Sequence, residues 1–494
     1  MEEEAAAPIA AGKLKVVLFP WLAFGHLIPF LELAKRLAAR GHAVSFLSTP
    51  RNIARLPPVP PRLSSLITLV SLPAPKVDGL PDGAESTADV PPEMNELIKK
   101  AVDGLASPFA AFLSNSVADG NKPDWIINDF CHHWLPSIAD VHGGIPCATF
   151  FVAQPAMIAF FGPRDARGPS PTWEDFTAPP AWCGGPSSSF PSAVAYRRHE
   201  AEWIATVFRP NVSGVSDLDR TWATIERSRL VIFRSCEELD PGAFTLLTDI
   251  FQKPVVPAGI LFQPEFSDDD DKPEERPEVL RWLDDQPPKS VIYVALGSEA
   301  PLTAHNLREL ALGLDQAGVQ FLWAFRKPAG MCAPDADVDT LLPAGFTERA
   351  VASGRGLVRT GWVPQTLVLA HAAVGAFLTH CGWGSTVECL AFGHPMVMLP
   401  FVVDQPLIAR TMAMRGIGVE VERDDMDGSF RREAVAAAVR RVMVEEEGKV
   451  FASNVAKLKE VLADQQRQDG YVDTLVECLR RYKDSTDFSE QSMC

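Results

Sequence analysis

Short apolar runs alternate with amphipathic stretches along most of the chain. The run KLKVVLFP, which starts at Lys13, is followed by a loop, WLAFGHLI, and by PFLELAKRLAARG, in which apolar residues recur with helical spacing up to Gly41. Another apolar run, HAVSFLSTP, comes next. A strand, a helix and a strand in this order form a βαβ unit, which predicts a parallel sheet.

The same alternation continues on both sides of an acidic break at residues 263–277, which contains four consecutive aspartates and three prolines. Further strands are expected at WIINDF, IPCATFFV, RLVIFRSC and KPVVPAGIL before the break, and at SVIYVALGS, QFLWAFR, RGLVRTGW, VGAFLTH and HPMVMLPFV after it. The break reads as a solvated linker. The sequence therefore predicts an α/β protein with two Rossmann-like, doubly wound parallel-sheet domains, at 1–262 and 278–463, followed by a helical segment and tail at 464–494.

Composition narrows the class of protein further. The chain has 494 residues, of which 47% are hydrophobic and 22% charged, as in soluble globular proteins. The 63 acidic and 46 basic residues give a net charge of −17, which disfavours nucleic acid and anionic lipid as partners. The nine cysteines form no C-x-x-C pair, the N-terminus is acidic, and Gln154 and Pro155 interrupt the longest apolar stretch. We expect a cytoplasmic protein without membrane insertion.

Metal-binding and hydrolase motifs are absent. There is no P-loop, no H-E-x-x-H and no G-x-S-x-G. The D-x-D-like groups Asp335–Asp337 and Asp268–Asp271 lie in polar loops flanked by proline, so we interpret them as solvated loops. His132 and His133 are adjacent, and neighbours on a helix point apart, so we assign them a structural role. No metal site is expected.

The segment Gly382–Val387, GWGSTV, follows an expected strand and opens an expected helix. This is the context of a dinucleotide-binding G-x-G-x-x-G turn, but the sixth position is Val387 and no acidic residue takes the usual ribose position after the next strand. The segment is therefore a weak match to the turn of nicotinamide-dependent oxidoreductases, and this function stays open as an alternative. Whatever the function, small residues at the N-terminus of a helix predict a site that binds phosphate.

Read as a whole, the 44 residues Trp362–Gln405 closely resemble the donor-binding signature of plant family-1 UDP-sugar glycosyltransferases. The W-x-P-Q, H-C-G-W, E and D-Q elements are in register, and GHLIP, IINDF and VALGS elsewhere resemble further family segments. The N-terminal string is similar to a branch whose members often glycosylate already glycosylated products. One position departs from the signature: Gly384 stands where the family usually has Asn.

This resemblance implies a GT-B fold, two Rossmann-like domains facing across a cleft, with the last helix (464–483) returning to the first domain. It implies an inverting, metal-independent transfer of glucose from UDP-glucose, which is a co-substrate, with no separate cofactor. The acceptor would be a hydroxyl of a small apolar or glycosylated plant metabolite, and the protein a monomer. A catalytically inactive UDP-sugar-binding protein is a second alternative.

The resemblance also implies roles for individual residues. His26, expected on the loop after the first strand, is the general base, and Asp129 orients it. Trp362 stacks on uracil beside Val363 and Gln365, Glu388 binds the ribose, and Asp404 and Gln405 bind the sugar hydroxyls near Trp383. The diphosphate is held by His380, Ser385, Ser298 and the backbone N–H groups of residues 383–385. Gln405 would offer both amide donors and an acceptor to adjacent hydroxyls.

Two expectations concern less certain parts of the site. Gly384 lacks the amide that Asn would offer the phosphate, so we expect a raised Michaelis constant for the donor. Gly384→Asn should then tighten UDP-glucose binding by roughly three- to tenfold. The sequence does not decide which residues form the acceptor pocket. Six apolar residues of the first domain could line it or belong to the core: Phe24, Phe130, Phe150, Phe151, Met157 and Trp203.

Overall fold

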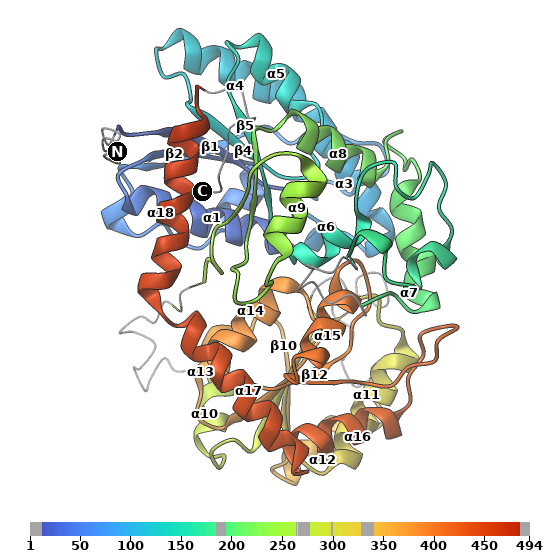
Figure 1. Cartoon of the computed structure of the whole chain (residues 1–494). Helices are drawn as coiled ribbons and strands as arrows, with labels where there is room; N and C mark the ends of the chain where they lie inside the picture. The colour runs from blue at the N-terminus through green and yellow to red at the C-terminus, as the bar shows by residue number, and fades with distance from the viewer. Residues whose placement is uncertain are drawn as a thin grey trace, which may run out of the picture.

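Two parallel β-sheets, each covered by helices on both faces, make up the molecule (Figure 1). The computed structural model describes residues 12–183, 194–262, 264, 277–297, 300–327 and 340–484. The first sheet lies in the upper half of Figure 1 and the second in the lower half. The predicted α/β architecture with two parallel-sheet domains is confirmed. Most of the expected linker, 263–277, lies outside the described residues, so the domain boundaries stay a prediction.

The first sheet has seven parallel strands in the order β3-β2-β1-β4-β5-β6-β7. Their bounds are β1 Lys15–Phe19, β2 Ala43–Ser48, β3 Ile67–Ser71, β4 Trp125–Asn128, β5 Cys147–Phe151, β6 Leu230–Phe233 and β7 Val255–Pro257. The chain starts in the middle of this sheet, at β1, and winds outward first to one side and then to the other. The order changes direction between β1 and β4, which pair in parallel from Val16 with Trp125 to Phe19 with Asn128.

The second sheet repeats this plan with six parallel strands in the order β10-β9-β8-β11-β12-β13. The bounds are β8 Val291–Ala295, β9 Gln320–Phe325, β10 Gly356–Thr360, β11 Val374–Thr379, β12 Met396–Met398 and β13 Gly418–Glu420. Here the order changes direction between β8 and β11, which pair up to Ala295 with Thr379.

Helices connect the strands and cover both sheets. Around the first sheet lie α1 Phe24–Ala39, α2 Pro50–Ala54, α3 Asn95–Gly104, α4 Ala106–Ala118, α5 Leu135–Val141, α6 Pro155–Phe161, α7 Arg198–Ile204, α8 Asp217–Arg227 and α9 Ala243–Phe251. The rest of the chain adds α10 Glu278–Asp284, α11 Ala304–Ala317, α12 Phe346–Ala352, α13 Gln365–Ala370, α14 Trp383–Phe392, α15 Gln405–Met414, α16 Arg432–Met443, α17 Glu447–Leu462 and α18 Gln465–Tyr482.

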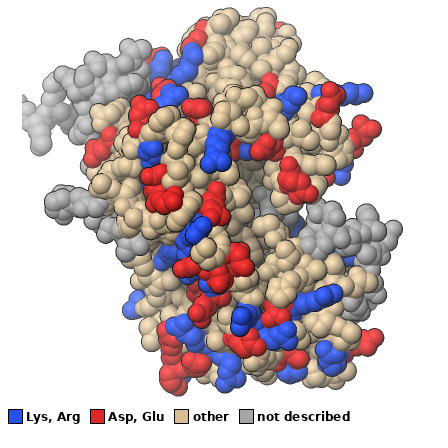
Figure 2. Space-filling model, turned by 90° about the vertical axis from the view of Figure 1, so that its right-hand side faces the viewer, with Lys and Arg blue, Asp and Glu red and all other residues tan. Residues whose placement is uncertain are grey.

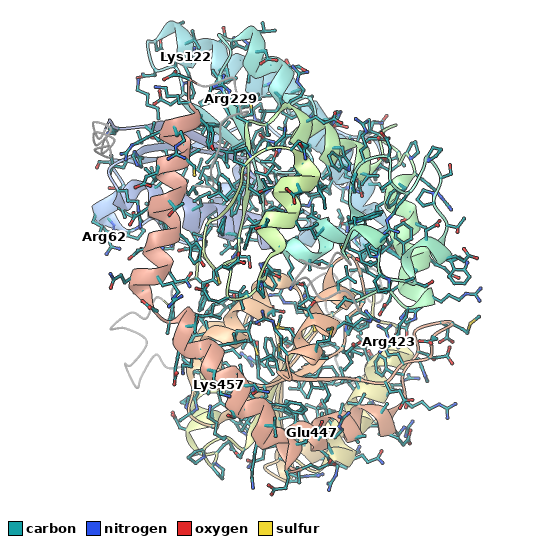
Figure 3. All side chains as sticks on the ribbon, viewed as in Figure 1. Arg62, Lys122, Arg229, Arg423, Glu447 and Lys457 are labelled. Atoms are coloured by element: carbon teal, nitrogen blue, oxygen red, sulfur yellow. The ribbon has the colours of Figure 1, made fainter. Side chains whose placement is uncertain are left out.

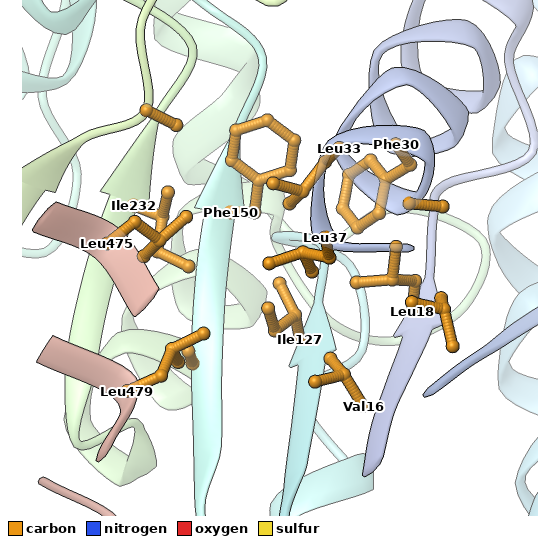
Figure 4. Close-up of a cluster of buried hydrophobic side chains, with 14 of the residues drawn as sticks. Val16, Leu18, Phe30, Leu33, Leu37, Ile127, Phe150, Ile232, Leu475 and Leu479 are labelled. Atoms are coloured by element: carbon orange, nitrogen blue, oxygen red, sulfur yellow. The ribbon is translucent and has the colours of Figure 1, made fainter. Parts of the chain in front are cut away.

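The central strands are buried throughout because helices cover both of their faces. All residues of β4, β5, β6 and β8 are buried, and all except Asn128 and Thr149 are apolar, close to the continuous apolar pattern expected of a parallel sheet. Figure 4 shows Leu33 and Leu37 of α1 packed against Ile127 of β4 and Phe150 of β5. Burial of such side chains contributes about 1.5–3 kcal/mol each, so these contacts fix the sheet that carries the site.

The last helix, α18, packs on the first domain. Its Leu475 and Leu479 belong to the same buried cluster as β4 and β5 (Figure 4), and the Leu479 carbonyl accepts a hydrogen bond from the indole of Trp125, 2.8 Å away. At the end of the helix Arg229 donates to the carbonyl of Tyr482 at 3.0 Å (Figures 1 and 3). The helix is therefore part of the first domain although it lies at the end of the chain.

Some local predictions were wrong. Helix α1 begins at Phe24, five residues before the predicted start at Pro29, so His26 lies in its first turn and not on a loop. The Ala23 carbonyl accepts from the amides of His26 and Leu27, both at 2.9 Å, and these bonds start the helix. Proline is common in the first turn of a helix, but here Pro29 lies inside α1. His132 and His133 lie in a turn before α5 and not on a helix.

Candidate active site between the two sheets

The places where the strand order reverses face each other across the domain boundary. In the first sheet, the chain leaves β1 toward His26 and leaves β4 directly into Asp129. In the second, it leaves β8 toward Gly297 and β11 directly into His380. Doubly wound sheets bind ligands beyond the carboxyl ends of their strands at this reversal. Figure 1 shows α14 and α15 at the boundary with the first domain, and in Figure 2 the surface is hollowed at this level.

His26 and Asp129 form a hydrogen-bonded pair. Nδ1 of His26 lies 2.7 Å from Oδ2 of Asp129, and the two side chains are 24% and 1% exposed. The carboxylate also accepts from the backbone amides of Trp21, at 2.9 Å, and Phe130, at 2.8 Å. A carboxylate only accepts hydrogen bonds, so Nδ1 of His26 carries the hydrogen and Nε2 is the ring nitrogen that can act as a base. The pair has the arrangement of a general base held by a buried acid.

The N-terminus of α14 lies beside His380 in the second domain. Gly382 caps this helix without a side-chain bond, so the backbone N–H groups of residues 383–385 have no partner inside the helix. Burial lowers the pKa of His380 to about 4, and no described residue is a hydrogen-bond partner of its buried Nδ1. The ring is therefore neutral at physiological pH. Ser385 is half-buried in the same turn.

Glycines are needed beside this imidazole because it packs against the backbone. A Cβ on Gly297, whose φ is +74°, would lie 2.8 Å from the His380 ring, and a Cβ on Gly382 would lie 2.6 Å from it. Cys381, between His380 and Gly382 in the chain, also has a positive φ, +65°. Non-glycine residues in this region store strain and are frequent at functional sites. The turn is thus built to bring the helix N-terminus and the imidazole close together.

The predicted uridine-binding residues lie at the start of α13. The Trp362 side chain is 77% exposed, so a face of its ring is open for stacking, whereas Val363 is buried. Gln365 donates from Nε2 to Glu388 at 2.6 Å, and Tyr293 donates to the Gln365 oxygen at 3.3 Å. Burial raises the pKa of Glu388 above its usual range. The structure brings Gln365 and Glu388 together, and Glu388 lies on α14, the helix that begins at the turn predicted to bind phosphate.

The predicted sugar-binding pair, Asp404 and Gln405, lies at the start of α15. The strand before it, β12, ends at Met398, four residues before the end of the expected strand HPMVMLPFV, so a loop of five residues leads from β12 to Asp404. Oε1 of Gln405 accepts from the amides of Phe401, at 2.9 Å, and Val402, at 3.1 Å. Since these N–H groups fix the orientation of the amide, only its Nε2 group is left for a ligand. The expectation that Gln405 offers both donor and acceptor to a sugar was therefore wrong.

Asp404 faces the first domain. Burial raises the pKa of its carboxyl to about 6, and His26 is close enough that its charge acts in the opposite direction. The preceding residue, Val403, has a φ of +56°, which is rare for a β-branched residue. Tyr196 of the first domain donates from its hydroxyl to the Val403 carbonyl at 2.9 Å. A contact from the opposite domain thus holds the strained residue that places Asp404.

Trp383 bridges the two domains. Its indole is buried and donates to the carbonyl of Arg234, directly after β6, at 2.7 Å. The Trp383 side chain therefore packs in the interface, and only its backbone N–H joins the helix N-terminus. The Arg234 guanidinium lies 3.5 Å, at Nη1, from where a Cβ on Gly384 would be. The sequence analysis missed Arg234 because this residue lies in the run RLVIFRSC, which was predicted to be a strand. The signal that could have found it is the positive charge of Arg234 next to the apolar residues of that run.

The apolar candidates for the acceptor pocket do not gather in one place. Phe150 and Phe151 are buried in β5 and belong to the core. Phe130 is partly buried, and the centre of its ring lies 5.9 Å from that of His26. Phe24 is partly buried in the turn that carries His26. Phe130 thus lies beside the base, whereas the Phe24 ring packs under the Arg55 guanidinium, 4.4 Å from its centre. Met157 packs with residues of α6 and α7, and Trp203 is exposed on α7.

Several predicted positions lie elsewhere. Ser298, the run Asp268–Asp271 and Asp335–Asp337 are outside the described residues. Within the described ranges, no three His, Cys, Asp or Glu side chains converge as a metal site would require. His132 is buried, with its ring centre 4.3 Å from that of Phe19. None of the helices in the described part of the chain has the length and apolar character needed to cross a membrane.

Comparison with known proteins identifies the class. The family described as UDP-glucoronosyl and UDP-glucosyl transferase matches residues 261–470. The chain is 43% identical to UDP-glycosyltransferase 91D1 of Stevia rebaudiana, covering 95% of this chain and 93% of that one. It is 41% identical to UDP-glycosyltransferase 91C1 of Arabidopsis thaliana, covering 94% and 96%. The solved structure of apo UGT2 from Phytolacca americana matches with a TM-score of 0.74 and 26% identity, covering 95% and 99%.

The chain belongs to the plant family-1 UDP-glycosyltransferases, and its two facing sheets have the GT-B fold. Enzymes of this family move a sugar from a UDP-sugar to a small acceptor. The family resemblance predicted from the sequence is confirmed, and the oxidoreductase alternative is wrong.

Proposed function

We propose that this protein is an inverting UDP-glucosyltransferase that works without a metal ion, with His26 as the general base. The observation that carries this proposal is the 2.7 Å hydrogen bond between His26 and the buried Asp129 at the reversal of the first sheet, with Asp404 of the second domain facing it. The base therefore lies beside the residues proposed to hold the sugar.

The reaction follows from the orientation of the imidazole. Nε2 of His26 takes the proton of the acceptor hydroxyl as its oxygen attacks the anomeric carbon of the sugar. The bond from that carbon to the β-phosphate oxygen breaks, and its electron pair leaves with UDP. Asp129 keeps the hydrogen on Nδ1 and stabilises the positive charge that forms on the ring. Attack opposite the leaving group converts an α-linked donor into a β-glycoside.

The leaving diphosphate needs positive charge or hydrogen-bond donors. We assign this task to the N–H groups of residues 383–385, to the Ser385 hydroxyl and to His380. Because burial keeps the pKa of His380 near 4, this residue acts as a neutral hydrogen-bond donor and not as a cation. Trp362 then stacks on uracil, with Val363 and Gln365 beside it.

Glucose is the proposed sugar, with Asp404 accepting from its hydroxyls and Nε2 of Gln405 donating to one of them. Phytolacca americana UGT2, 25% identical over 95% of this chain with a TM-score of 0.73, is described in complex with UDP-2fluoro-glucose and pterostilbene. Soyasaponin III rhamnosyltransferase of Glycine max, 34% identical over 95% of this chain, is named for another sugar. The donor therefore has to be tested directly.

The proposed acceptor is a hydroxyl of a small apolar or glycosylated plant metabolite, which would bind beside Phe130 and His26. We further propose that the enzyme acts as a monomer in the cytoplasm, as its reduced-thiol composition suggests. Among the described residues, the cysteines are buried and form no disulfide.

A turnover experiment tests the proposal. The purified chain is incubated with UDP-glucose, UDP-galactose or UDP-rhamnose and a panel of hydroxylated plant metabolites, and UDP release and glycoside formation are measured together. We expect glycosides with UDP-glucose, and NMR coupling at the anomeric proton that identifies the β-configuration. UDP binding without glycoside formation from any acceptor would favour the inactive alternative. An α-configured product would contradict the inverting mechanism.

A further inference from the structure

Arg234 is a buried cation at the boundary between the domains that no step of the mechanism uses so far. Arg234 directly follows β6 of the first domain and is 4% exposed. Its amide donates to the Phe151 carbonyl at 2.9 Å, and its own carbonyl accepts from the Trp383 indole at 2.7 Å. The backbone is therefore anchored on one side to its own sheet and on the other to α14 of the second domain.

The side chain is held at one end and open at the other. Nε donates to the Ile260 carbonyl at 2.9 Å, which fixes the plane of the guanidinium. Among the described residues, none accepts a hydrogen bond from Nη1 or Nη2. Burial lowers the pKa of Arg234 to about 10, with Glu388 and Glu32 acting in the opposite direction, so the group stays charged at neutral pH. A buried charge with two open donor groups needs a counter-charge.

The open end points to the N-terminus of α14. Nη1 is 3.5 Å from the position that a Cβ on Gly384 would take, and Gly384 is the second residue of that helix. The signature of this family places an Asn at 384, whose amide would extend from this Cβ. The guanidinium thus stands next to the volume left empty by the missing side chain, beside free N–H groups that also attract an anion.

We propose that Arg234 binds the diphosphate of the UDP-sugar and takes the place of the side-chain donor that Gly384 lacks. This assignment rests on the proposed function. Arginine suits the role because its fork of N–H groups matches phosphate oxygens, and hydrogen bonds between charged groups are roughly twice as strong as neutral ones. Since Arg234 belongs to the first domain and α14 to the second, the diphosphate would join the two domains.

The experiment measures the binding of UDP and of uridine, which lacks phosphate, by calorimetry. We expect Arg234→Met to weaken UDP binding by about ten- to a hundredfold and to leave uridine binding unchanged. Arg415→Met is the matched control, because Arg415 also reaches across the domain boundary to a backbone carbonyl, that of Glu238 at 3.1 Å, outside the donor site. It should change neither affinity.

The outcomes separate this inference from the proposed function. A wild-type chain that does not bind UDP would contradict the proposed function itself. Wild-type binding with unchanged UDP affinity in Arg234→Met would overturn the role of Arg234 alone, as would equal losses for UDP and uridine, which indicate a damaged fold. If the Met variant does not fold, Arg234→Lys keeps the charge without the fork, and an intermediate UDP affinity is expected. Wild-type affinity in Arg234→Lys would then refute bidentate binding.

A second measurement uses Gly384. If Arg234 replaces the missing amide, Gly384→Asn should improve UDP binding more in the Arg234→Met background than in the wild type, because the two groups then serve the same phosphate. Equal improvement in both backgrounds would show that the two positions act independently and would contradict the proposed replacement.

Discussion

Asp404 makes donor binding depend on pH. Burial raises the pKa of this carboxyl to about 6, from an ordinary value of 3.8. If only the carboxylate accepts hydrogen bonds from the sugar hydroxyls, the donor binds the ionised form and its affinity follows the ionised fraction. Nearly all of the carboxyl is ionised at pH 7.5, and about one part in eleven at pH 5. We therefore expect UDP-glucose to bind about tenfold more weakly at pH 5 than at pH 7.5.

The sign of this effect separates it from acid unfolding. A carboxyl whose pKa is higher in the folded state binds its proton more tightly there. Its contribution to folding stability is therefore fully present below the unfolded pKa near 3.8 and is lost as the pH rises through about 6. Donor affinity should change in the opposite direction, falling as the pH falls. A loss of binding at pH 5 cannot then be a loss of stability caused by Asp404.

Calorimetric titration of UDP-glucose without acceptor, at steps between pH 5 and 7.5, measures the effect. Each phosphate of UDP-glucose has one ester and one anhydride bond, so its single acidic oxygen stays ionised in this range, and His380 stays neutral because burial holds its pKa near 4. Asp404→Asn is the matched variant, and its affinity should be low and independent of pH. His26→Ala removes the imidazole whose charge acts on Asp404 and should keep the pH dependence. A flat wild-type profile, or the same slope in Asp404→Asn, would refute the reasoning.

Four further outcomes are expected. His26→Ala should lower turnover by roughly 10²–10⁴-fold with nearly unchanged UDP binding. If the variant turns over an acceptor with a weakly acidic hydroxyl as fast as the wild type does, His26 is not the general base. Activity should survive excess EDTA; a loss that Mg²⁺ or Mn²⁺ restores would show that a metal takes part. The specificity constant for UDP-glucose should exceed that for UDP-galactose by at least several-fold, and equal values would exclude a selective contact from Gln405. Tyr196→Phe should raise the Michaelis constant for UDP-glucose and leave uridine binding unchanged, because it removes only the bond that holds Val403.

The order of strands and helices could be predicted because a parallel sheet buried on both faces leaves continuous apolar runs in the sequence. The two strands that the prediction missed lack this signal. In β3, Ile67–Ser71, only the first residue is buried, because this strand lies at the edge of its sheet. The edge strand β13, Gly418–Glu420, has three residues and is too short for any pattern. Both strands form through pairing with a neighbour.

Residues of the donor site could be predicted where they lie within one continuous segment. The resemblance to the family signature covers Trp362 to Gln405 as one continuous segment and implied that Gln365 and Glu388 serve the same ligand, and the structure places the two side chains within hydrogen-bond distance. The orientation of a side chain is not encoded in this way. Trp383 and the oxygen of Gln405 were expected to face the sugar, and each is instead used by a backbone partner nearby or in the other domain.

Arg234 and Tyr196 belong to a part of the site that no spacing rule reaches, because they approach from the opposite domain. Arg234 lies 149 residues before Trp383 in the sequence, yet the two are hydrogen-bonded. From the sequence alone, Gly384 reads as the loss of one neutral donor. In the folded chain, the absence of a side chain leaves room beside a guanidinium, which carries a full charge and a geometry suited to phosphate. Whether such a departure weakens a site depends on what the facing domain places within about 4 Å of it, so the departure has to be judged together with that domain.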